Sequence, residues 1–219
     1  MKLSSLIIAL FILSACTTTN NTAPSPGSLC SADSNTLDSQ WYNQKHTYRL
    51  RHGGILQLRE KTIPITGFMV LDTNSTTADV VILAGLGIKL ATLKISQDSY
   101  KIVYASPVAR RIPHFFEQCA FSIQHTFLKG FPKEESPCSM VNGMREYVEE
   151  TLEGTLHSRI DPLSDSMTDK VLESNNKIWT VQYQGTTDIN NTRFPEKVTF
   201  NHITRNYTVI LRLKSAEIQ

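Results

Sequence analysis

From residue 46 onward, hydrophobic and polar residues alternate with a period of two through most of the chain. Alternation of this kind is typical of strands that bury one face and expose the other. Turn residues separate the segments at intervals of about 8–12 residues, which favours an antiparallel meander that curls into a barrel or sandwich. The predicted strands before residue 106 are 46–51, 55–60, 63–73, 78–86, 87–95 and 99–105.

A second group of strands is predicted towards the C-terminus, over 169–174, 177–185, 195–203 and 207–218. The segment 144–160 between the two groups is ambiguous. Met144, Tyr147 and Val148 fit one face of a helix, whereas Val148, Glu150 and Leu152 fit one face of a strand. We expect strands there, because the family resemblance described below favours them.

One segment, 111–132, has a different period. Phe115, Cys119, Ile123 and Phe127 recur every four residues, which predicts an amphipathic helix of about four turns. A proline suits its first turn, and a Gly-Phe-Pro sequence suits its end.

The apolar stretch 80–93, VVILAGLGIKLATL, holds Leu86 between Gly85 and Gly87. We predict a tight turn between two strands with Leu86 at its tip. A large apolar side chain in water is unfavourable unless something covers it. The alternative, in which Leu86 folds inward and packs against the hairpin, is equally compatible with the sequence.

The N-terminus has the pattern of a bacterial lipoprotein signal. Lys2 precedes an apolar run over 6–13, which is shorter than the roughly 20 residues of a membrane-spanning helix and ends in Leu-Ser-Ala-Cys16. This ending resembles the lipobox, so we expect removal of residues 1–15 and attachment of membrane lipid to Cys16. The alternative is ordinary signal cleavage beside a chance cysteine. Thr17, in place of aspartate, indicates the outer membrane, with the protein facing the periplasm.

Residues 16–40 are rich in Thr, Asn, Ser and Pro and poor in apolar side chains. Such a segment buries too little surface to offset its ordering entropy, so we expect a lipidated flexible tether and a single folded domain over 41–219. A first strand within 16–40 is the alternative. The remaining cysteines are Cys30, Cys119 and Cys138. In an oxidising compartment they form at most one intrachain disulfide, and we favour Cys119–Cys138 over Cys30–Cys138.

Composition and motifs narrow the function classes. The chain is 40% hydrophobic and 19% charged, a balance that supports a packed core. Without Lys2 its formal charge is 21 − 20 = +1, too small to indicate a nucleic-acid partner. CxxC, GxSxG, HExxH and glycine-rich phosphate loops are absent from the sequence. The SxxK spacing at 174–177 and the incipient calcium loop at 33–38 lack their partner residues. We expect no cofactor, no metal and no enzymatic activity.

Four segments, in this order, resemble the LolA/LolB lipoprotein-localisation superfamily, and within it an uncharacterised set of LolB-like outer-membrane lipoproteins. They are ILAGLGIKL (82–90), the predicted helix (111–132), WTVQYQG (179–185) and FPEKVTFNHITRNYTVILRL (194–213). The resemblance covers about residues 46–218. It implies an α+β fold that is mostly antiparallel β, a half-open curled β-barrel of about eleven strands with a helical lid over an apolar cavity. On that lid, Phe115, Phe116, Ile123 and Phe127 would line the cavity.

The resemblance also implies a function. A LolA-like periplasmic carrier would hand over the acyl chains of a lipoprotein or of another lipid, and this protein would receive them and insert the cargo into the outer membrane. By position, the role of the membrane-directed loop leucine falls on Leu86, although the loop here is shorter and has no proline. The alternative is a non-transporting accessory lipoprotein that uses the same sheet to dock other proteins.

Overall fold

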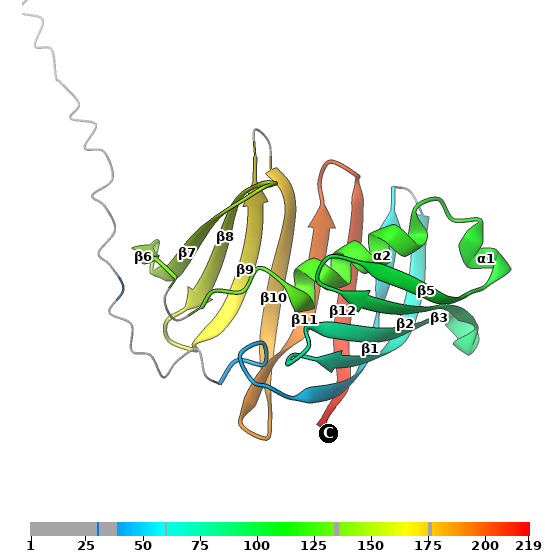
Figure 1. The fold of residues 1–219 in the computed structure, drawn as a ribbon, viewed down its shortest axis with the longest axis horizontal. Helices are drawn as coiled ribbons and strands as arrows, with labels where there is room; N and C mark the ends of the chain where they lie inside the picture. The colour runs from blue at the N-terminus through cyan, green and yellow to red at the C-terminus, as the bar shows by residue number, and fades with distance from the viewer. Residues whose placement is uncertain (1–29, 31–38, 60, 134–135, 175–176) are drawn as a thin grey trace, which may run out of the picture.

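The computed structural model describes residues 30, 39–59, 61–133, 136–174 and 177–219, and these residues form a curled antiparallel sheet with a helix on its inner face (Figure 1). The predicted signal peptide, Cys16 and most of the predicted tether lie outside the described residues. The strands are β1 (Thr47–Leu58), β2 (Lys61–Asp72), β3 (Thr77–Ala84), β4 (Lys89–Ser96), β5 (Tyr100–Ala105), β6 (Cys138–Val141), β7 (Met144–Thr151), β8 (Gly154–Asp161), β9 (Ser166–Glu173), β10 (Lys177–Ile189), β11 (Thr192–His202) and β12 (Tyr207–Ile218).

The sheet consists of two meanders that the first and last strands join. Each strand within β1–β5 and within β6–β12 pairs with its neighbour in the chain, and β1 pairs with β12. Strands β5 and β6 are the two edges, so the sheet does not close into a complete barrel. The predicted fold class, mostly antiparallel β in a half-open curled barrel, is confirmed. The described residues contain twelve strands, against about eleven expected.

The ambiguous segment 144–160 forms the antiparallel pair β7 and β8, as the resemblance predicted. Period-two burial is clear in the C-terminal strands. In β10, Trp179, Val181 and Tyr183 are all buried, while the residues between them are more exposed. Local alternation therefore sets which face of each strand enters the core.

The N-terminal meander differs from its predicted form at one place. We expected separate strands over 46–51 and 55–60, but β1 is continuous from Thr47 to Leu58, with a bulge at Arg51/His52 in its pairing to β12. The glycine pair Gly53-Gly54 lies inside the strand rather than at a turn. A Cβ atom at Gly54 would lie 2.0 Å from the Ile210 carbonyl oxygen on β12. Glycine is needed there because two backbones approach closely.

The predicted helix is present and crosses the inner face of the sheet. It comprises α2 (Phe115–Ile123) and a π-helical turn, η2 (Gln124–Leu128). The Phe121 ring lies 6.0 Å from the Phe200 ring on β11, and the His125 ring lies 4.5 Å from Trp179 on β10. The described residues contain two further short helical elements, the 3-10 turn η1 (Gly85–Gly87) and the single-turn helix α1 (Pro107–Arg110). The turn at Leu86 was expected from the sequence, whereas α1 was not.

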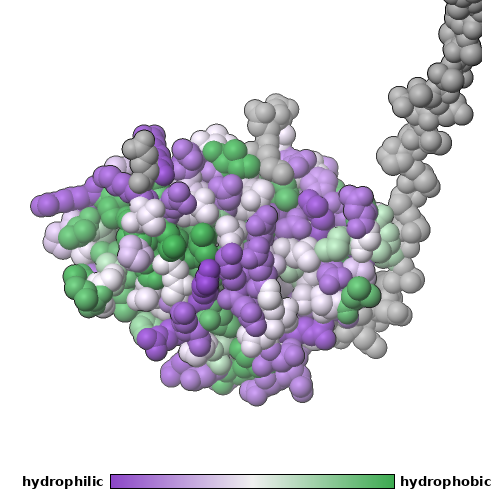
Figure 2. All heavy atoms as spheres, turned by 180° about the vertical axis from the view of Figure 1, so that it is seen from behind, coloured by the Kyte–Doolittle hydropathy of each residue, from purple (hydrophilic) through white to green (hydrophobic). Residues whose placement is uncertain are grey.

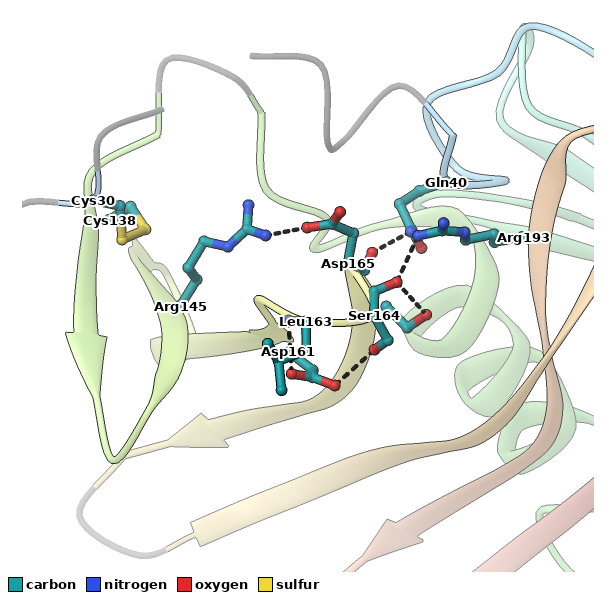
Figure 3. Close-up of polar contacts among 10 residues, drawn as sticks. Cys30, Gln40, Cys138, Arg145, Asp161, Leu163, Ser164, Asp165 and Arg193 are labelled. Carbon is teal, nitrogen blue, oxygen red and sulfur yellow. Dashed lines mark hydrogen bonds and ion pairs between the residues drawn. A yellow bond between two sulfur atoms is a disulfide. The ribbon is translucent and has the colours of Figure 1, made fainter. Parts of the chain in front are cut away.

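The start of the folded domain is attached to the β6–β11 half of the sheet (Figure 3). Trp41 is buried and stacks on Phe194, with ring centroids 5.8 Å apart. The Gln40 side chain donates to the Asp165 carbonyl oxygen, and the backbone amide of Trp41 donates to the Arg193 carbonyl oxygen. These contacts hold the residues just before β1 against the sheet.

The disulfide joins Cys30 to Cys138, and Cys119 is a buried free thiol (Figure 3). The favoured pairing of Cys119 with Cys138 is therefore wrong, and the alternative pairing is correct. Cys119 lies on α2 with its side chain in the core, whereas Cys138 begins the edge strand β6, where the backbone amide of Cys30 also donates to the Cys138 carbonyl oxygen. The predicted tether is thus cross-linked to the domain at Cys30.

Candidate functional site: an apolar cavity beneath the inner helix

A cavity of about 60 Å³ lies between α2 and the inner faces of β1–β4 and β12. Its walls are mostly aliphatic. The sheet contributes Leu56, Val80, Ile82 and Leu93, and the helix contributes Cys119, Ser122 and Ile123. Inward-pointing residues of successive strands converge on this point because the sheet is curled around the helix.

The few polar groups in the wall carry no charge at neutral pH. Burial lowers the pKa of His52 to about 4, so its imidazole is neutral at pH 7. The Ser122 hydroxyl donates to the Gln118 carbonyl oxygen at 2.8 Å within its own helix, so it is not left without a partner. Burial also raises the pKa of the Cys119 thiol to about 12. An uncharged apolar wall of this kind suits a hydrocarbon ligand.

The size of the cavity limits what it can hold without movement. A water-sized group needs about 10–15 Å³ of such space, so a cavity of about 60 Å³ admits roughly four to six groups. A long acyl chain exceeds this, and its entry requires α2 to move away from the sheet.

The C-terminal end of the lid is fixed to the sheet by buried hydrogen bonds. Lys170 on β9 is fully buried, and its ammonium group donates to the carbonyl oxygens of His125 and Lys129. The Tyr183 hydroxyl on β10 donates to the Thr126 carbonyl oxygen at 2.8 Å. The last carbonyls of a helix lack partners within the helix, and here side chains of the sheet supply the donors.

The N-terminal half of the lid is held more weakly. Arg205 forms an ion pair with Glu117 at 2.7 Å, but both side chains are 44% exposed. Exposed pairs of this kind contribute little, about 0–1 kcal/mol. The Tyr207 hydroxyl on β12 adds two hydrogen bonds of 3.4 Å, one accepted from Ser122 and one donated to the Gln118 carbonyl oxygen. Buried apolar side chains such as Phe115 and Ala120 also pack this half into the core, so the two halves differ in their polar anchors, which among the described residues are both short and buried only at η2.

The four helix residues expected to line the cavity lie at different places in the structure. Ile123 borders the cavity, whereas Phe115 and Phe127 are buried in other parts of the core. Phe116 is partly buried and packs edge-on against Phe115, with ring centroids 5.3 Å apart. Sequence reasoning missed Ser122 and assigned Cys119 to a disulfide. The spacing 119, 122, 123 (i, i+3, i+4) was the signal that could have identified this face.

Leu86 is fully exposed at the tip of η1, between β3 and β4. Its φ angle is +63°, in the left-handed region that a leucine seldom adopts. The neighbouring Ile88 is 57% exposed. Of the two orientations that the sequence left open, the structure therefore has Leu86 pointing outward.

In the part of the chain that the structure describes, no helix is long and apolar enough to cross a membrane. Within the same residues, no group of three or more His, Cys, Asp or Glu side chains is placed to hold a metal ion. The lipidation expected at Cys16 concerns a residue outside the described ranges.

Together these features define a class of fold, a half-open antiparallel barrel with a helical lid over an apolar cavity. No protein-family model matches the sequence, and a search of curated proteins finds no match either.

Several solved structures are similar to this one over most of their length, at very low sequence identity. One is a domain of Vibrio parahaemolyticus assigned to outer membrane lipoprotein sorting (7% identity, 85% of this chain, 90% of that chain, TM-score 0.48). Another is a LolA superfamily protein of Nitrosomonas europaea (5% identity, 83% of this chain, 89% of that chain, TM-score 0.49). A third is a DUF1329 family protein of Desulfovibrio piger (7% identity, 84% of this chain, 90% of that chain, TM-score 0.49).

Proposed function

We propose that this protein is a lipid-anchored outer-membrane lipoprotein that binds acyl chains beneath α2 and receives or inserts lipoprotein or lipid cargo at the outer membrane. The observation that carries the proposal is the uncharged aliphatic cavity between the helix and the curled sheet. Apolar surface inside such a cavity attracts hydrocarbon at about 25 cal/mol per Å² removed from water.

Binding requires a lid movement, and the contacts of α2 indicate its direction. The η2 end is tied to β9 and β10 through Lys170 and Tyr183, which are buried. Besides the buried packing of Phe115, the opposite end has only weaker polar ties among the described residues: the exposed pair Arg205–Glu117 and two 3.4 Å hydrogen bonds of the Tyr207 hydroxyl. We infer that the N-terminal half swings outward while η2 acts as the pivot, so that an acyl chain enters between α2 and the inner faces of β1–β4.

Delivery to a membrane assigns a role to the exposed loop. The lipid proposed on Cys16 keeps the protein at the outer membrane, and a LolA-like carrier in the periplasm would supply the cargo. Leu86 would contact the bilayer, which would cover the apolar side chain that stands in water here.

Acyl binding can be tested with a fluorescent fatty-acid probe and the purified protein. Val80 points into the cavity from β3, so Val80→Phe should fill the space and lower probe affinity at least tenfold. The matched control is Val103→Phe, because Val103 is 53% exposed on β5 and does not border the cavity. Thermal unfolding of both variants checks that they fold. Absence of saturable binding to the wild-type protein would refute the proposal.

One observation supports the alternative function as an accessory docking protein. A groove of about 670 Å³ runs over the outer face of β10–β12 and includes Lys197, Arg212 and Lys214. Figure 2, which views the molecule from behind, shows a band of hydrophilic side chains across the middle of that side. If the wild-type protein fails to bind the acyl probe but binds an acidic protein partner, with loss on Arg212→Gln, the docking function is the correct one.

A further inference from the structure

Three leucines stand fully exposed at turns, and their electrostatic surroundings differ. Leu86, Leu152 and Leu163 have exposed fractions of 102%, 108% and 94%. Leu152, between β7 and β8, is flanked in sequence by Glu149, Glu150 and Glu153. Leu163, between β8 and β9, is flanked by Asp161 and by Asp165, which forms an ion pair with Arg145. The η1 turn that carries Leu86 has no acidic residue between Asp79 and Asp98.

Basic residues surround the η1 turn instead. Lys89 begins β4, two residues after the end of η1, and its ammonium group lies 5.0 Å from the ring centroid of Tyr104. Arg110 and Arg111, at the end of α1, are both exposed. Among the described residues, no carboxylate forms an ion pair with any of these three cations.

Helix α1 is held beside the η1 turn. The backbone amide of Ser106, its N-cap, donates to the Leu90 carbonyl oxygen at 2.9 Å, only two residues after Ile88. The Ser106 hydroxyl accepts from the Ala109 amide at 3.1 Å and fixes the first turn. Val108 projects from this turn and is 59% exposed. In Figure 1, α1 lies at the end of the molecule opposite β6.

Apolar and basic side chains are therefore combined at one end of the protein. The set consists of Leu86, Ile88, Lys89, Val108, Arg110 and Arg111, which we call the basic rim. We propose that the basic rim is a docking surface for an anionic phospholipid bilayer. Its apolar side chains enter the boundary between headgroups and acyl chains, and its three cations lie at the level of the lipid phosphates.

Charge complementarity selects this partner and this end of the molecule. A bilayer with anionic lipids attracts each Lys or Arg near its surface and repels the carboxylates around Leu152 and Leu163. Three exposed apolar side chains from two adjacent elements suit the interfacial region of a membrane. This inference rests on the proposed function, in which Leu86 contacts the membrane that receives the cargo. It adds the side chains of α1 and the three cations to that membrane contact.

The test uses brominated lipids, which quench tryptophan only on contact. Val108→Trp places a reporter on α1, while the native Trp41 and Trp179 are each 2% exposed and provide a constant background. Leu152→Trp is the matched control, an equally exposed turn with acidic neighbours. The full chain is mixed with excess vesicles of brominated phosphatidylcholine, with or without brominated phosphatidylglycerol. All variants share the same N-terminus, so a lipid at Cys16 would not account for a difference between positions 108 and 152.

We expect quenching of the reporter at position 108 only in vesicles with phosphatidylglycerol, and no quenching at position 152. In the Val108→Trp background, Arg110→Gln with Arg111→Gln should reduce docking roughly thirtyfold, about fivefold per charge. Lys197→Gln with Arg212→Gln removes the same charge from the outer groove and should change docking less than about twofold. High salt should mimic the first pair, because it screens exposed charges.

Three results would overturn the proposal: no quenching at position 108, equal quenching at position 152, or a greater loss from the groove variants than from the rim variants. Failure of this proposal can be distinguished from failure of the proposed function, because the acyl-probe assay measures binding in solution without a membrane. The rim variants should leave that binding unchanged.

Discussion

The buried Lys170 leads to a prediction that links pH, stability and the lid. Burial lowers the pKa of this ammonium group well below 10.5, and the nearby Lys129 acts in the same direction. Between the lowered pKa and 10.5, the unfolded chain binds a proton that the folded protein does not bind. Raising the pH through this window therefore favours the folded state, by up to about 1.4 kcal/mol per pH unit.

Lys170→Met keeps an unbranched side chain and removes the titrating group. The carbonyl oxygens of His125 and Lys129 then lose a buried donor, which costs about 1–3 kcal/mol each. The loss of a desolvated ammonium group offsets much of this near neutral pH. We expect a small change in the free energy of unfolding at pH 7 and a loss of about 2 kcal/mol or more near pH 10.

Urea unfolding of wild type and variant across this pH range measures the difference. Buried tyrosines oppose the effect at still higher pH, since burial raises the pKa of Tyr48 to about 12, but they are common to both proteins. Lys94→Met is the control, because Lys94 is 63% exposed and pairs with Asp79 at 3.6 Å. If Lys170→Met keeps the pH slope of the wild type, the inference that burial lowers the pKa of Lys170 is refuted.

Three further predictions concern the loop, the cavity thiol and the disulfide. Leu86→Glu should leave the free energy of unfolding within about 0.5 kcal/mol of wild type, because the side chain is fully exposed, and it should reduce transfer of cargo to vesicles; a large loss of stability in urea would contradict this. Cys119 should resist alkylation at pH 8, since its pKa is raised to about 12, and it should become reactive when a fatty acid opens the lid. Equal labelling with and without fatty acid, measured by mass spectrometry, would argue against lid movement. Cys138→Ser should abolish the cross-link and lower stability by about 2–4 kcal/mol, whereas Cys119→Ser should leave the cross-link intact in a non-reducing peptide map.

Local sequence pattern was sufficient for most of the secondary structure. The alternation through Trp179, Val181 and Tyr183 predicts an inward face that is in fact buried. The four-residue spacing of Phe115, Cys119, Ile123 and Phe127 predicts the helix. The segment 144–160 is an exception: its local pattern was ambiguous and its charges favoured a helix, and only the family resemblance predicted the strands that it forms.

The errors occurred where one segment depends on a distant one. Gly53-Gly54 has the composition of a turn, but it lies within β1 because β12 approaches its backbone. The helix was identified correctly, yet three of its four predicted cavity residues lie elsewhere. Which face of α2 meets the cavity depends on the curvature of a sheet whose strands come from both halves of the chain.

The sequence by itself determined the antiparallel strands, the inner helix and the turn that carries Leu86, because strand and helix periods follow from local backbone geometry. Only the tertiary structure decided that Cys30 pairs with Cys138, that Leu86 points into solvent, and that the N-cap of α1 is hydrogen-bonded to β4 just after the turn. These outcomes depend on distances between residues far apart in the chain, and sheet curvature sets those distances. The position of the apolar cavity has the same origin, since residues from five strands and one helix meet there only after the sheet has curled.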